Sequence, residues 1–389
     1  MKLVVPSETK VGEKRVALVP EAAAKLIKLG LDVSVQTKAG SAATYSDEEY
    51  IAVGAKIFPK TELTNEIASA DVIASVRPLP TKNIASLKKG AITVSFMSPV
   101  NNAKEIKAIA DVKATALSFD MVPRISRAQS MDALTSQALC GGYRATLIAA
   151  ERSTKFFPML MTAAGTVQPA KVLVLGAGVA GLQAMATAKR LGAVVSAYDV
   201  RSSSADEVKS MGATFINLGL DALEGTGGYA REMNEERAKA QQDALKPYVS
   251  ESDIVITTAA VPGKKAPLLI TKDMMSEMKP GAILVDLAAE TGGNIQGSVA
   301  GEDVNLKVPG GLITIVGCKD LPSELATHAS KLYAQNVVSL LSLFTVEGKV
   351  NPDINDEVVA GSAVAFAGEI RNELTREALG IEPLAKEGE

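Results

Sequence analysis

Residues 171–201 read KVLVLGAGVAGLQAMATAKRLGAVVSAYDVR, a strand pattern that runs through a glycine turn into a helix and a second strand. Gly176, Gly178 and Gly181 have the GxGxxG spacing directly after the first strand. In a dinucleotide-binding turn the first glycine permits the tight turn, the second admits a pyrophosphate close to the backbone, and the third lets the helix pack on the strand. The stretch therefore predicts a nucleotide-binding α/β domain whose helix start offers unpaired amides to an anion.

The second strand of this stretch ends in an acid, Asp199, where a carboxylate can accept hydrogen bonds from the adenosine ribose hydroxyls. The same carboxylate would repel a 2′-phosphate, so the pattern favours NAD(H) over NADP(H). The neighbouring Arg201 keeps NADP(H) open as an alternative. The predicted site also includes the helix start and the residue after the acid, namely Val179, Ala180 and Val200.

Strand patterns rich in β-branched residues alternate with helical patterns along the chain, which is typical of parallel sheets with crossover helices. A first series begins with a strand at 2–6 and lacks a glycine fingerprint, whereas the second series contains the glycine turn. We predict an α/β fold of two doubly wound Rossmann-like domains with parallel sheets and a cleft between them. An apolar tail near 358–366 is expected to return to the first domain. The expected domains are residues 1–130 with 310–389, and residues 131–309.

Composition limits the class of protein and its partners. Of the 389 residues, 47% are hydrophobic and 22% are charged, which is typical of a soluble globular protein. The formal net charge is −3 and no basic stripe could neutralise a phosphate backbone, so we expect no nucleic-acid partner. The start MKLVVPSETK lacks a secretory hydrophobic segment, and no apolar run reaches the ~18 residues of a spanning helix. These features predict a cytoplasmic chain that is not inserted in a membrane.

The cysteines and the single histidine point to no metal chemistry. Cys140 and Cys318 lie far apart, with no CxxC spacing and no companion histidine. We interpret both as reduced core thiols and expect no metal site. His328 lies in a helical pattern and is interpreted as structural.

Longer motifs extend the interpretation across nearly the whole chain. The opening PSETKVGEKRVALVPEAAAKLIKLG resembles the N-terminus shared by alanine dehydrogenases and the NAD(H)-binding component of proton-translocating transhydrogenases. Four stretches are similar to the transhydrogenase component specifically: PRISRAQSMDALTSQ at 123–137, FPMLMTAAGTVQPAKVLVLGAGVAGLQA at 157–184, EGTGGYAREM at 224–233 and VDLAAETGGN at 285–294. On the order and length of these motifs, the chain is identified as a member of the alanine dehydrogenase/transhydrogenase family.

The resemblance implies a set of residues around the nicotinamide. Arg124, Gln129 and Asp132 correspond to a loop that contacts the ring, its carboxamide and its ribose. Thr135 stands where the family commonly has Ser; it keeps the hydroxyl and adds a methyl group. The segment also has an ordinary structural interpretation, because Ser126 and Gln129 could form a capping box and Asp132 a first-turn charge. Both interpretations can hold at once.

Other contacts are expected on loops. Tyr229 follows Gly228 in a glycine-rich arm, and in the family a corresponding tyrosine loop closes over bound nucleotide. The alternative is a mobile surface linker with an exposed tyrosine. The stretch TAAVPGKKAP at 258–267 follows a strand at the edge where ligands bind in such sheets, so we expect backbone contacts there. The remaining predicted contacts are Thr258, Ala259, Pro262 and Glu290.

An amino-acid dehydrogenase is the main alternative function, because its fold and N-terminal signature are similar. Its chemistry needs a proton acceptor and cations for a substrate carboxylate, and Arg15 could supply one cation. The alanine dehydrogenase pattern, however, has Lys where Ser75 stands, His where Met97 stands and Asp where Glu290 stands. These replacements remove the proton-handling groups and leave the dinucleotide site intact. A non-catalytic NAD(H)-sensing module is the third alternative.

The resemblance thus implies direct hydride transfer between NADH on this chain and NADP⁺ on a partner subunit. Such an enzyme is a Re/Si-specific transhydrogenase that is active only with its partners. A separate membrane-spanning subunit would couple transfer to proton translocation, with this chain peripheral on the cytoplasmic side of the inner membrane. The resemblance also implies a homodimer, for which the apolar stretch FPMLMTAAGTV at 157–167 is the candidate contact.

Overall fold

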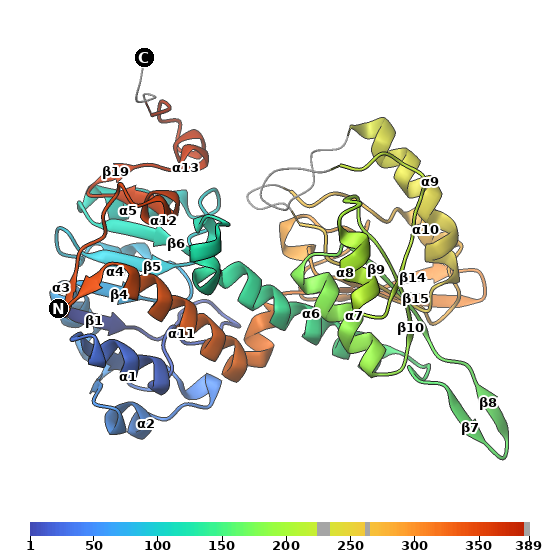
Figure 1. Ribbon diagram of the computed structural model, residues 1–389, viewed down its shortest axis with the longest axis horizontal. Coiled ribbons are helices and arrows are strands. Elements are labelled where there is room, and N and C mark those ends of the chain that lie inside the picture. The colour runs from blue at the N-terminus through green and yellow to red at the C-terminus, as the bar shows by residue number, and fades with distance from the viewer. Residues whose placement is uncertain (224–233, 261–264, 385–389) are drawn as a thin grey trace. The chain divides into compact units, whose positions relative to one another are not determined.

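A computed structural model describes residues 1–223, 234–260 and 265–384 (Figure 1). The chain forms two compact units. The first unit comprises Met1–Gln137 and Pro322–Glu389, and the second comprises Ala138–Leu321. The predicted contacts that lie outside the described residues are Gly228, Tyr229 and Pro262.

The first unit is built on an eight-stranded sheet of order β19-β18-β6-β5-β4-β1-β2-β3. The strands from β6 to β3 run parallel. The C-terminal segment adds β18 beside β6 and β19 beside β18, both antiparallel, so it extends the sheet instead of covering it. The strand bounds are β1 Lys2–Val5, β2 Asp32–Gln36, β3 Lys56–Phe58, β4 Val72–Ala74, β5 Ile92–Ser95, β6 Thr115–Ser118, β18 Ala363–Phe366 and β19 Glu369–Ile370.

Both faces of this sheet carry an apolar core, because alternate side chains of a strand point to opposite faces. In β1, Leu3 and Val5 pack in the cluster that includes helices α1 and α11, whereas Val4 packs with α3 and α5. Helix α1 begins with Pro20, a residue favoured at the first helical position, and buries Leu26. The helix bounds are α1 Pro20–Lys28, α2 Asp47–Ala52, α3 Leu63–Ser69, α4 Thr81–Ile84, α5 Ala103–Asp111, α11 Ala326–Leu343, α12 Glu357–Ser362 and α13 Glu373–Ala378.

The second unit has a seven-stranded sheet of order β11-β10-β9-β12-β13-β15-β14. All neighbours are parallel except the β14–β15 pair. The first strand in sequence, β9, lies between β10 and β12, so the strand order reverses at β9, which is where open α/β sheets bind ligands. The strand bounds are β9 Lys171–Leu175, β10 Val194–Tyr198, β11 Thr214–Phe215, β12 Ile254–Thr257, β13 Ile283–Asp286, β14 Asp303–Val308 and β15 Gly311–Gly317.

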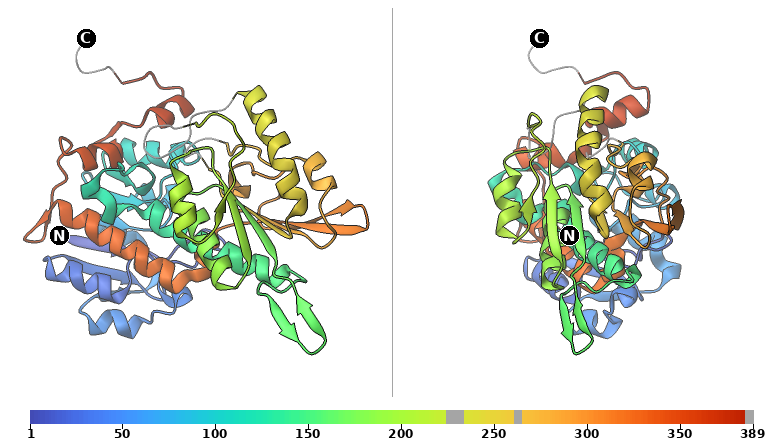
Figure 2. Two further views of the ribbon diagram at one scale, coloured as in Figure 1. Left: turned by 45° about the vertical axis from the view of Figure 1, so that its right-hand side comes forward. Right: turned by 90° about the vertical axis from the view of Figure 1, so that its right-hand side faces the viewer.

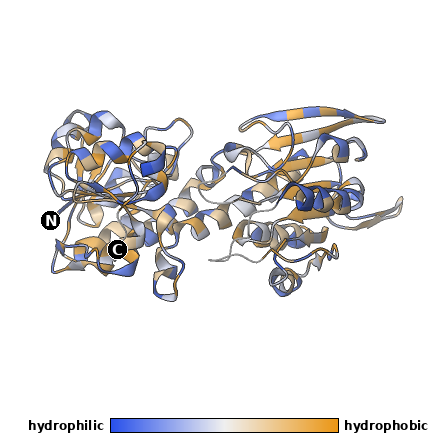
Figure 3. Ribbon diagram, turned by 90° about the horizontal axis from the view of Figure 1, so that it is seen from above, coloured by the Kyte–Doolittle hydropathy of each residue, from blue (hydrophilic) through white to orange (hydrophobic). Residues whose placement is uncertain are grey.

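Helices cover both faces of this second sheet. In β9, Val172 and Val174 pack with α6 and α7, whereas Leu173 and Leu175 pack with α9 and α10. Figure 3 shows apolar residues concentrated in the strands of this sheet. The predicted doubly wound α/β fold is therefore confirmed, with antiparallel strands added at the sheet edges. The helix bounds are α6 Ala133–Arg152, α7 Val179–Arg190, α8 Ser204–Ser210, α9 Glu235–Glu251 and α10 Lys272–Ser276.

The apolar stretch between α6 and β9 forms a hairpin of β7 Leu160–Thr162 and β8 Gly165–Val167. Every residue of both strands is exposed, including Met161 at 79%. Figure 2 shows the hairpin extending away from the sheet of the second unit. A solvent-exposed apolar arm of this kind needs an explanation, because isolated two-stranded hairpins are marginally stable.

The structure also describes the lengths of the helices and the state of the two cysteines. No helix in the described part of the chain is both long and apolar enough to cross a bilayer. Cys140 and Cys318 are buried thiols that are not joined in a disulfide, as their spacing predicted.

Candidate dinucleotide site

The glycine turn between β9 and α7 has the geometry that its three glycines predicted. Gly176 has a φ of +106°, and a Cβ on it would lie 2.6 Å from the hydroxyl oxygen of Thr258. A Cβ on Gly181 would lie 1.9 Å from the carbonyl oxygen of Gly176, so the helix can approach the strand only without a side chain there. No described atom lies within 4 Å of a Cβ built on Gly178, which leaves its backbone open to a ligand.

Helix α6 supports the first turn of α7, where Val179 and Ala180 lie. A Cβ on Gly142 would lie 2.0 Å from the carbonyl oxygen of Ala180, so α6 and α7 meet backbone to backbone. The hydroxyl of Thr146 donates to the carbonyl oxygens of Gly142 at 3.1 Å and Ala184 at 3.2 Å. In the sequence, the Gly141–Gly142 pair indicated only a break in a helical pattern. The cost of glycine inside a helix was the signal that a close contact required it.

The predicted ribose acid, Asp199, is nearly buried and fully engaged at the end of β10. Its Oδ2 accepts hydrogen bonds from the backbone of Ala177 at 2.7 Å and from Nη2 of Arg201 at 3.0 Å. Its Oδ1 accepts hydrogen bonds from the backbone N and from Nε of Arg201, both at 2.9 Å. The side chains of Asp199 and Arg201 are 9% and 16% exposed, respectively. The neighbouring Val200 accepts a hydrogen bond from the backbone of Leu223 at 2.9 Å.

The loop after β12 lies against the glycine turn. The hydroxyl of Thr258 donates to the carbonyl oxygen of Gly176 at 3.2 Å, and its backbone N donates to Leu175 at 2.9 Å. The backbone N of Ala259 donates to Oδ1 of Asn294 at 3.1 Å. The structure thus brings Thr258 together with the predicted glycines in one arrangement.

Glu290, the predicted contact after β13, is exposed and binds the backbone of a neighbouring loop. It is exposed in the single-turn helix Ala289–Thr291, and its Oε2 accepts a hydrogen bond from the backbone of Asp320 at 2.9 Å. Asp320 has a φ of +47°, so this bond fixes a strained position after β15. The assignment of Glu290 as a nucleotide contact stays a prediction.

The predicted nicotinamide residues lie in the first unit, around the start of α6. The side chains of Arg124 and Gln129 are exposed. Asp132 caps α6, because its Oδ1 accepts the backbone N–H of Thr135 at 2.9 Å and its Oδ2 accepts the Thr135 hydroxyl at 2.7 Å. The short helix Ser126–Met131 has Ile125 at its N-cap position and no side-chain cap, so the capping-box alternative at Ser126 is wrong. The carboxylate and the hydroxyl assigned to the nicotinamide are therefore already in contact.

Two anchors without a signal in the sequence hold this loop in place. Arg127 donates to both carboxylate oxygens of Asp356, at 2.8 and 3.0 Å. These bonds lower the pKa of Asp356 below its usual value. Asn336 donates to the carbonyl oxygen of Ser130 at 2.9 Å and accepts the Ser136 hydroxyl at 2.7 Å. The backbone on both sides of Gln129 is therefore fixed while its side chain remains exposed.

Two protein-family models match this chain. The family model for the alanine dehydrogenase/PNT N-terminal domain matches residues 4–140, and the model for the C-terminal domain matches residues 145–373. The chain belongs to the alanine dehydrogenase/PNT family. It is 43% identical over 380 residues to the first portion of NAD(P) transhydrogenase subunit alpha from Rhodospirillum rubrum, covering 95% of this chain and 97% of that protein.

Two further family members show the range of similarity. A solved transhydrogenase structure from Sinorhizobium meliloti superposes with a TM-score of 0.82 at 39% identity, covering 96% of this chain and 99% of that chain. The alanine dehydrogenase from Halomonas elongata is 32% identical over 296 residues, covering 75% of this chain and 74% of that protein. The family thus contains both classes of enzyme that the sequence left open.

Within this family, the dehydrogenase alternative depends on groups in the first unit. Arg15 is 4% exposed, and its Nε and Nη2 each donate to Glu13 at 2.7 Å, while Nη1 donates to Gln137 at 2.7 Å. Ser75 donates its hydroxyl to the carbonyl oxygen of Arg77 at 2.6 Å, and Met97 is fully buried. The cation expected for a substrate carboxylate is therefore held by an internal carboxylate.

Two acids near Arg15, Glu8 and Glu13, have pKa values that are shifted in opposite directions. Burial raises the pKa of Glu8 to about 7, although its carboxylate accepts bonds from the backbone of Val76 at 2.6 Å and Arg77 at 3.2 Å. Burial also opposes ionisation of Glu13, but the hydrogen bonds and charge of Arg15 outweigh it and lower the pKa to about 2. His328 lies apart from both acids in sequence, on α11.

No group of three or more His, Cys, Asp or Glu side chains that could hold a metal ion occurs among residues 1–223, 234–260 and 265–384.

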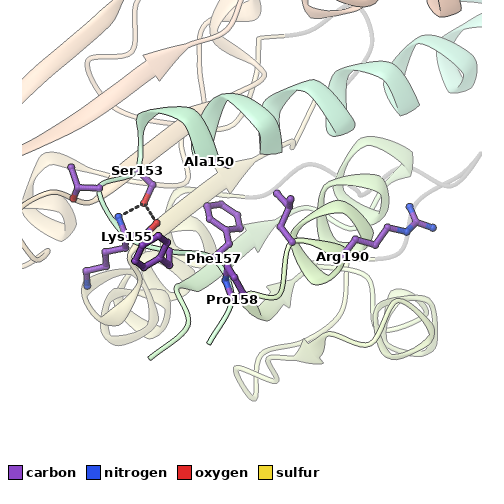
Figure 4. A pocket seen from close by; sticks show the side chains of 9 residues that line it. Ala150, Ser153, Lys155, Phe157, Pro158 and Arg190 are labelled. Carbon is purple, nitrogen blue, oxygen red and sulfur yellow. Dashed lines mark hydrogen bonds between the residues drawn. The ribbon is translucent and has the colours of Figure 1, made fainter. Parts of the chain in front are cut away.

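A pocket in the second unit lies at the base of the β7–β8 hairpin (Figure 4). On its rim, the hydroxyl of Ser153 accepts the backbone N–H of Lys155 at 3.1 Å and donates to the Lys155 carbonyl oxygen at 3.2 Å. Its lining includes none of the predicted nucleotide contacts and comprises Ala150, Ser153, Thr154, Lys155, Phe156, Phe157, Pro158, Arg190 and Leu191.

Proposed function

We propose that this chain is the NAD(H)-binding component of a proton-translocating transhydrogenase. In this role it exchanges a hydride between NADH, bound here, and NADP⁺, bound on a partner subunit. The observation that carries the proposal is a glycine turn with an open backbone at Gly178. It occurs in a chain that has uncharged Ser75 and Met97 where the alanine dehydrogenase pattern has Lys and His. The similarity to the Rhodospirillum rubrum subunit supports the same assignment.

The adenosine and pyrophosphate would bind to the second unit. The open backbone at Gly178 and the amides of Val179 and Ala180 receive the pyrophosphate at the start of α7. Asp199 accepts the ribose hydroxyls, and its charge disfavours a 2′-phosphate. Because Arg201 occupies both carboxylate oxygens, the ribose must share or displace this guanidinium. NAD(H) is therefore the proposed substrate of this chain.

The nicotinamide would be oriented by Arg124, Gln129, Asp132 and Thr135. The exposed side chains of Arg124 and Gln129 can donate to the carboxamide. Asp132 and Thr135 are already bonded to each other, so they offer the nicotinamide ribose an acceptor and a hydroxyl at fixed positions. Fixed partners reduce the entropy lost when the ring is aligned.

The chemical step needs no proton acceptor on this chain. The C4–H bond of NADH breaks, and its electron pair moves with the hydrogen to C4 of NADP⁺, giving NAD⁺ and NADPH. Such a transfer requires the two carbons to approach to about 3–3.5 Å in a site that excludes water. Neutral Ser75 and buried Met97 are compatible with this chemistry and not with deprotonation of an amino acid.

The remaining parts of the enzyme would be other subunits. A membrane-spanning subunit couples hydride transfer to proton translocation, and this chain stays peripheral on the cytoplasmic side of the inner membrane. We further propose that two copies associate through the exposed β7–β8 hairpin, which would cover apolar Met161. The transfer would be Re/Si-specific and would require the partner carrying NADP(H).

The deciding experiment follows reduction of an NAD⁺ analogue by NADPH, with this protein and a purified NADP(H)-binding transhydrogenase subunit. Turnover only when both are present supports the proposal. No turnover despite measured NADH binding would favour a non-catalytic NAD(H)-sensing module. Oxidation of NADH with pyruvate and ammonia, without a second protein, would favour the alanine dehydrogenase alternative, which the Halomonas elongata relative keeps open.

A further inference from the structure

The nicotinamide loop, residues 123–132, has a buried side and an exposed side. Ala128 and Met131 are 1% and 7% exposed, and they belong to the apolar cluster that includes residues of α11. Gln129, which lies between them, is exposed. The short helix in this loop therefore rests on α11 by one face and leaves Gln129 in solvent.

Asn336 is a buried amide of α11 that binds this loop. It is 6% exposed, and Tyr333, one turn earlier in the helix, is fully buried. Its Nδ2 donates to the carbonyl oxygen of Ser130 at 2.9 Å, and its Oδ1 accepts the Ser136 hydroxyl at 2.7 Å. An apolar side chain could fill a similar volume, but only an amide offers both a donor and an acceptor. One side chain thus binds the end of the loop and the first turn of α6.

A second anchor holds the start of the loop. Both terminal nitrogens of Arg127 donate to the carboxylate of Asp356, at 2.8 and 3.0 Å, and Asp356 also caps α12 by accepting the backbone N–H of Val358 at 2.8 Å. A Cβ on Gly361 would lie 3.1 Å from Cδ of Pro123, so α12 packs closely on the loop. The nicotinamide loop is thus attached to α12 and α11, two helices from the C-terminal part of the chain (Figure 1).

The points of attachment alternate along the chain with the side chains that the proposed function assigns to the nicotinamide. Gln129 directly precedes Ser130, and Asp132 lies between Ser130 and Ser136. A misplacement of about 1 Å can slow a reaction of aligned groups about a hundredfold. Side chains that hold the loop can therefore control the rate of transfer without touching the nucleotide.

We propose that Asn336 and Asp356 are positioning residues for hydride transfer, which hold the nicotinamide loop on α11 and α12 so that Gln129 and Asp132 meet the nicotinamide in a fixed arrangement. This inference rests on the proposed function, because it requires a hydride to be transferred from NADH bound to this chain. It differs from a general stabilising role in one respect. Loss of an anchor should slow transfer from bound NADH and leave the affinity for NADH, whose adenosine and pyrophosphate bind to the second unit, nearly unchanged.

The test measures two quantities in Asn336→Ala: the dissociation constant of NADH, and the single-turnover rate of hydride transfer to NADP⁺ on the partner subunit at saturating NADH. We expect the rate to fall at least tenfold and the dissociation constant to change less than threefold. Gln335→Ala is the matched control, because Gln335 is an exposed amide of the same helix that accepts a bond from Nζ of Lys25 at 2.8 Å. It should change neither quantity more than twofold. Equal losses of rate and affinity in Asn336→Ala, or a rate equal to that of the control, would overturn the positioning role.

A second variant covers the case in which Asn336→Ala does not fold. Asp356→Asn, at a side chain that is 28% exposed, keeps an oxygen that can cap α12 and loses the charge that binds Arg127. We expect transfer to slow at least fivefold, with less than a threefold change in the dissociation constant of NADH. Asp353→Asn, at an exposed acid that precedes α12, is its control and should transfer at the normal rate. A rate in Asp356→Asn equal to that of its control would overturn the proposal.

Hydrogen exchange without nucleotide or partner separates this inference from the proposed function. The backbone N–H of Ala128 donates to the carbonyl oxygen of Ile125 at 3.0 Å, and that of Asp132 donates to Gln129 at 3.3 Å. In each anchor variant these two amides should exchange at least fivefold faster than in the matched control, while the amides of β9 exchange at the same rate. Unaltered exchange in both anchor variants would overturn the positioning role. No turnover by the unaltered protein with its partner would instead contradict the proposed function.

Discussion

Asp199 and Arg201 form an ion pair at the end of β10, with side-chain hydrogen bonds of 2.9 and 3.0 Å from the guanidinium to the two carboxylate oxygens. The acid that the glycine-turn pattern assigns to the ribose is thus joined to the cation that kept NADP(H) open. The pair places both possible determinants of cofactor choice at one point. Which charge dominates decides whether a ribose hydroxyl or a 2′-phosphate is preferred.

Replacing Asp199 should therefore change the preference between NADH and NADPH more than it changes the stability of the folded protein. In Asp199→Asn, the amide can still accept the Ala177 N–H, but the charge that repels a 2′-phosphate is gone and Arg201 can pair with the phosphate. We expect the ratio of NADH to NADPH affinity to fall at least tenfold, which is about 1.4 kcal/mol. Fluorescence titration of both reduced nucleotides measures it. The double variant with Arg201→Ala should lose the NADPH gain; an unchanged ratio in the single variant would contradict this account.

The two adjacent glycines of α6 should respond differently to alanine. A methyl group on Gly142 would lie 2.0 Å from the Ala180 carbonyl oxygen, whereas one on Gly141 would lie 3.9 Å from Leu287. We expect Gly142→Ala to lower the free energy of unfolding by about 1–3 kcal/mol and to weaken NADH binding. Gly141→Ala should be neutral or stabilising by up to about 1 kcal/mol. Urea unfolding and NADH titration test the pair, and equal behaviour of the two variants would refute the contact.

Changes around the nicotinamide loop should affect transfer more than binding. Asp132→Asn keeps an oxygen that can cap α6 but removes the charge, and Arg124→Ala removes an exposed donor. In each variant, hydride transfer to NADP⁺ on the partner should slow at least tenfold while the NADH dissociation constant changes less than threefold. Thr135→Ser retains the hydroxyl and should transfer at near the normal rate. Equal losses in rate and binding would count against an orienting role.

The buried cluster of the first unit should make stability depend on pH. The pKa of Glu8 is raised to about 7 from its ordinary value of 4.5, so its contribution is complete below pH 4.5 and is lost as pH rises through 7. The total loss is at most about 3 kcal/mol. Urea unfolding from pH 5 to 8.5 should show this decline, and Glu8→Gln should flatten it. Glu48→Gln, a change at an exposed acid, should leave it intact.

Glu13 should give a pH dependence of stability with the opposite sign, in a lower pH range than that of Glu8. Its pKa is lowered to about 2, so the stability that it contributes is present above pH 4.5 and is lost as pH falls toward 2. For Glu8, a loss of stability near pH 7 that persisted in Glu8→Gln would show that another group causes it.

The exposed hairpin predicts a change in association state. Met161 is 79% exposed on β7, and a charge there would be buried in the proposed contact between two copies. We expect Met161→Glu to shift the protein from dimer to monomer in sedimentation experiments. Val11→Glu, at a residue that is 92% exposed in the first unit, is the control and should not. If Met161→Glu and Val11→Glu had the same mass in solution, the hairpin would not be part of the interface between two copies.

Local features of the fold were predictable from the sequence, whereas long-range contacts were not. Residues 171–201 predicted β9, the glycine turn and α7, because each depends on neighbouring residues and on backbone conformation. The contact made by Gly142 was not predictable, because its partner, Ala180, is close only after α6 and α7 pack. The antiparallel strands β14, β18 and β19 were missed for the same reason, since strand direction is a property of pairing.

The candidate site shows the same division. The glycine pattern predicted a tight turn at Gly176 with an open backbone at Gly178, and the structure has that geometry. The pattern also predicted an acid available to ribose, but nothing in the sequence indicated that Arg201 would fold back onto Asp199. Asn336 had no signal of its own, because its importance depends on burial and on contacts with Ser130 and Ser136.

The order of pairing in the first sheet affects how the protein can be made on the ribosome. Strand β6 receives its neighbour β18 only after the whole second unit has been synthesised, and the core around β1 also needs residues of α11. The second unit has its own sheet and cores, so it can fold while the ribosome is still translating α11. Until then, β6 has an open edge to which a chaperone, or a neighbouring nascent chain, can bind.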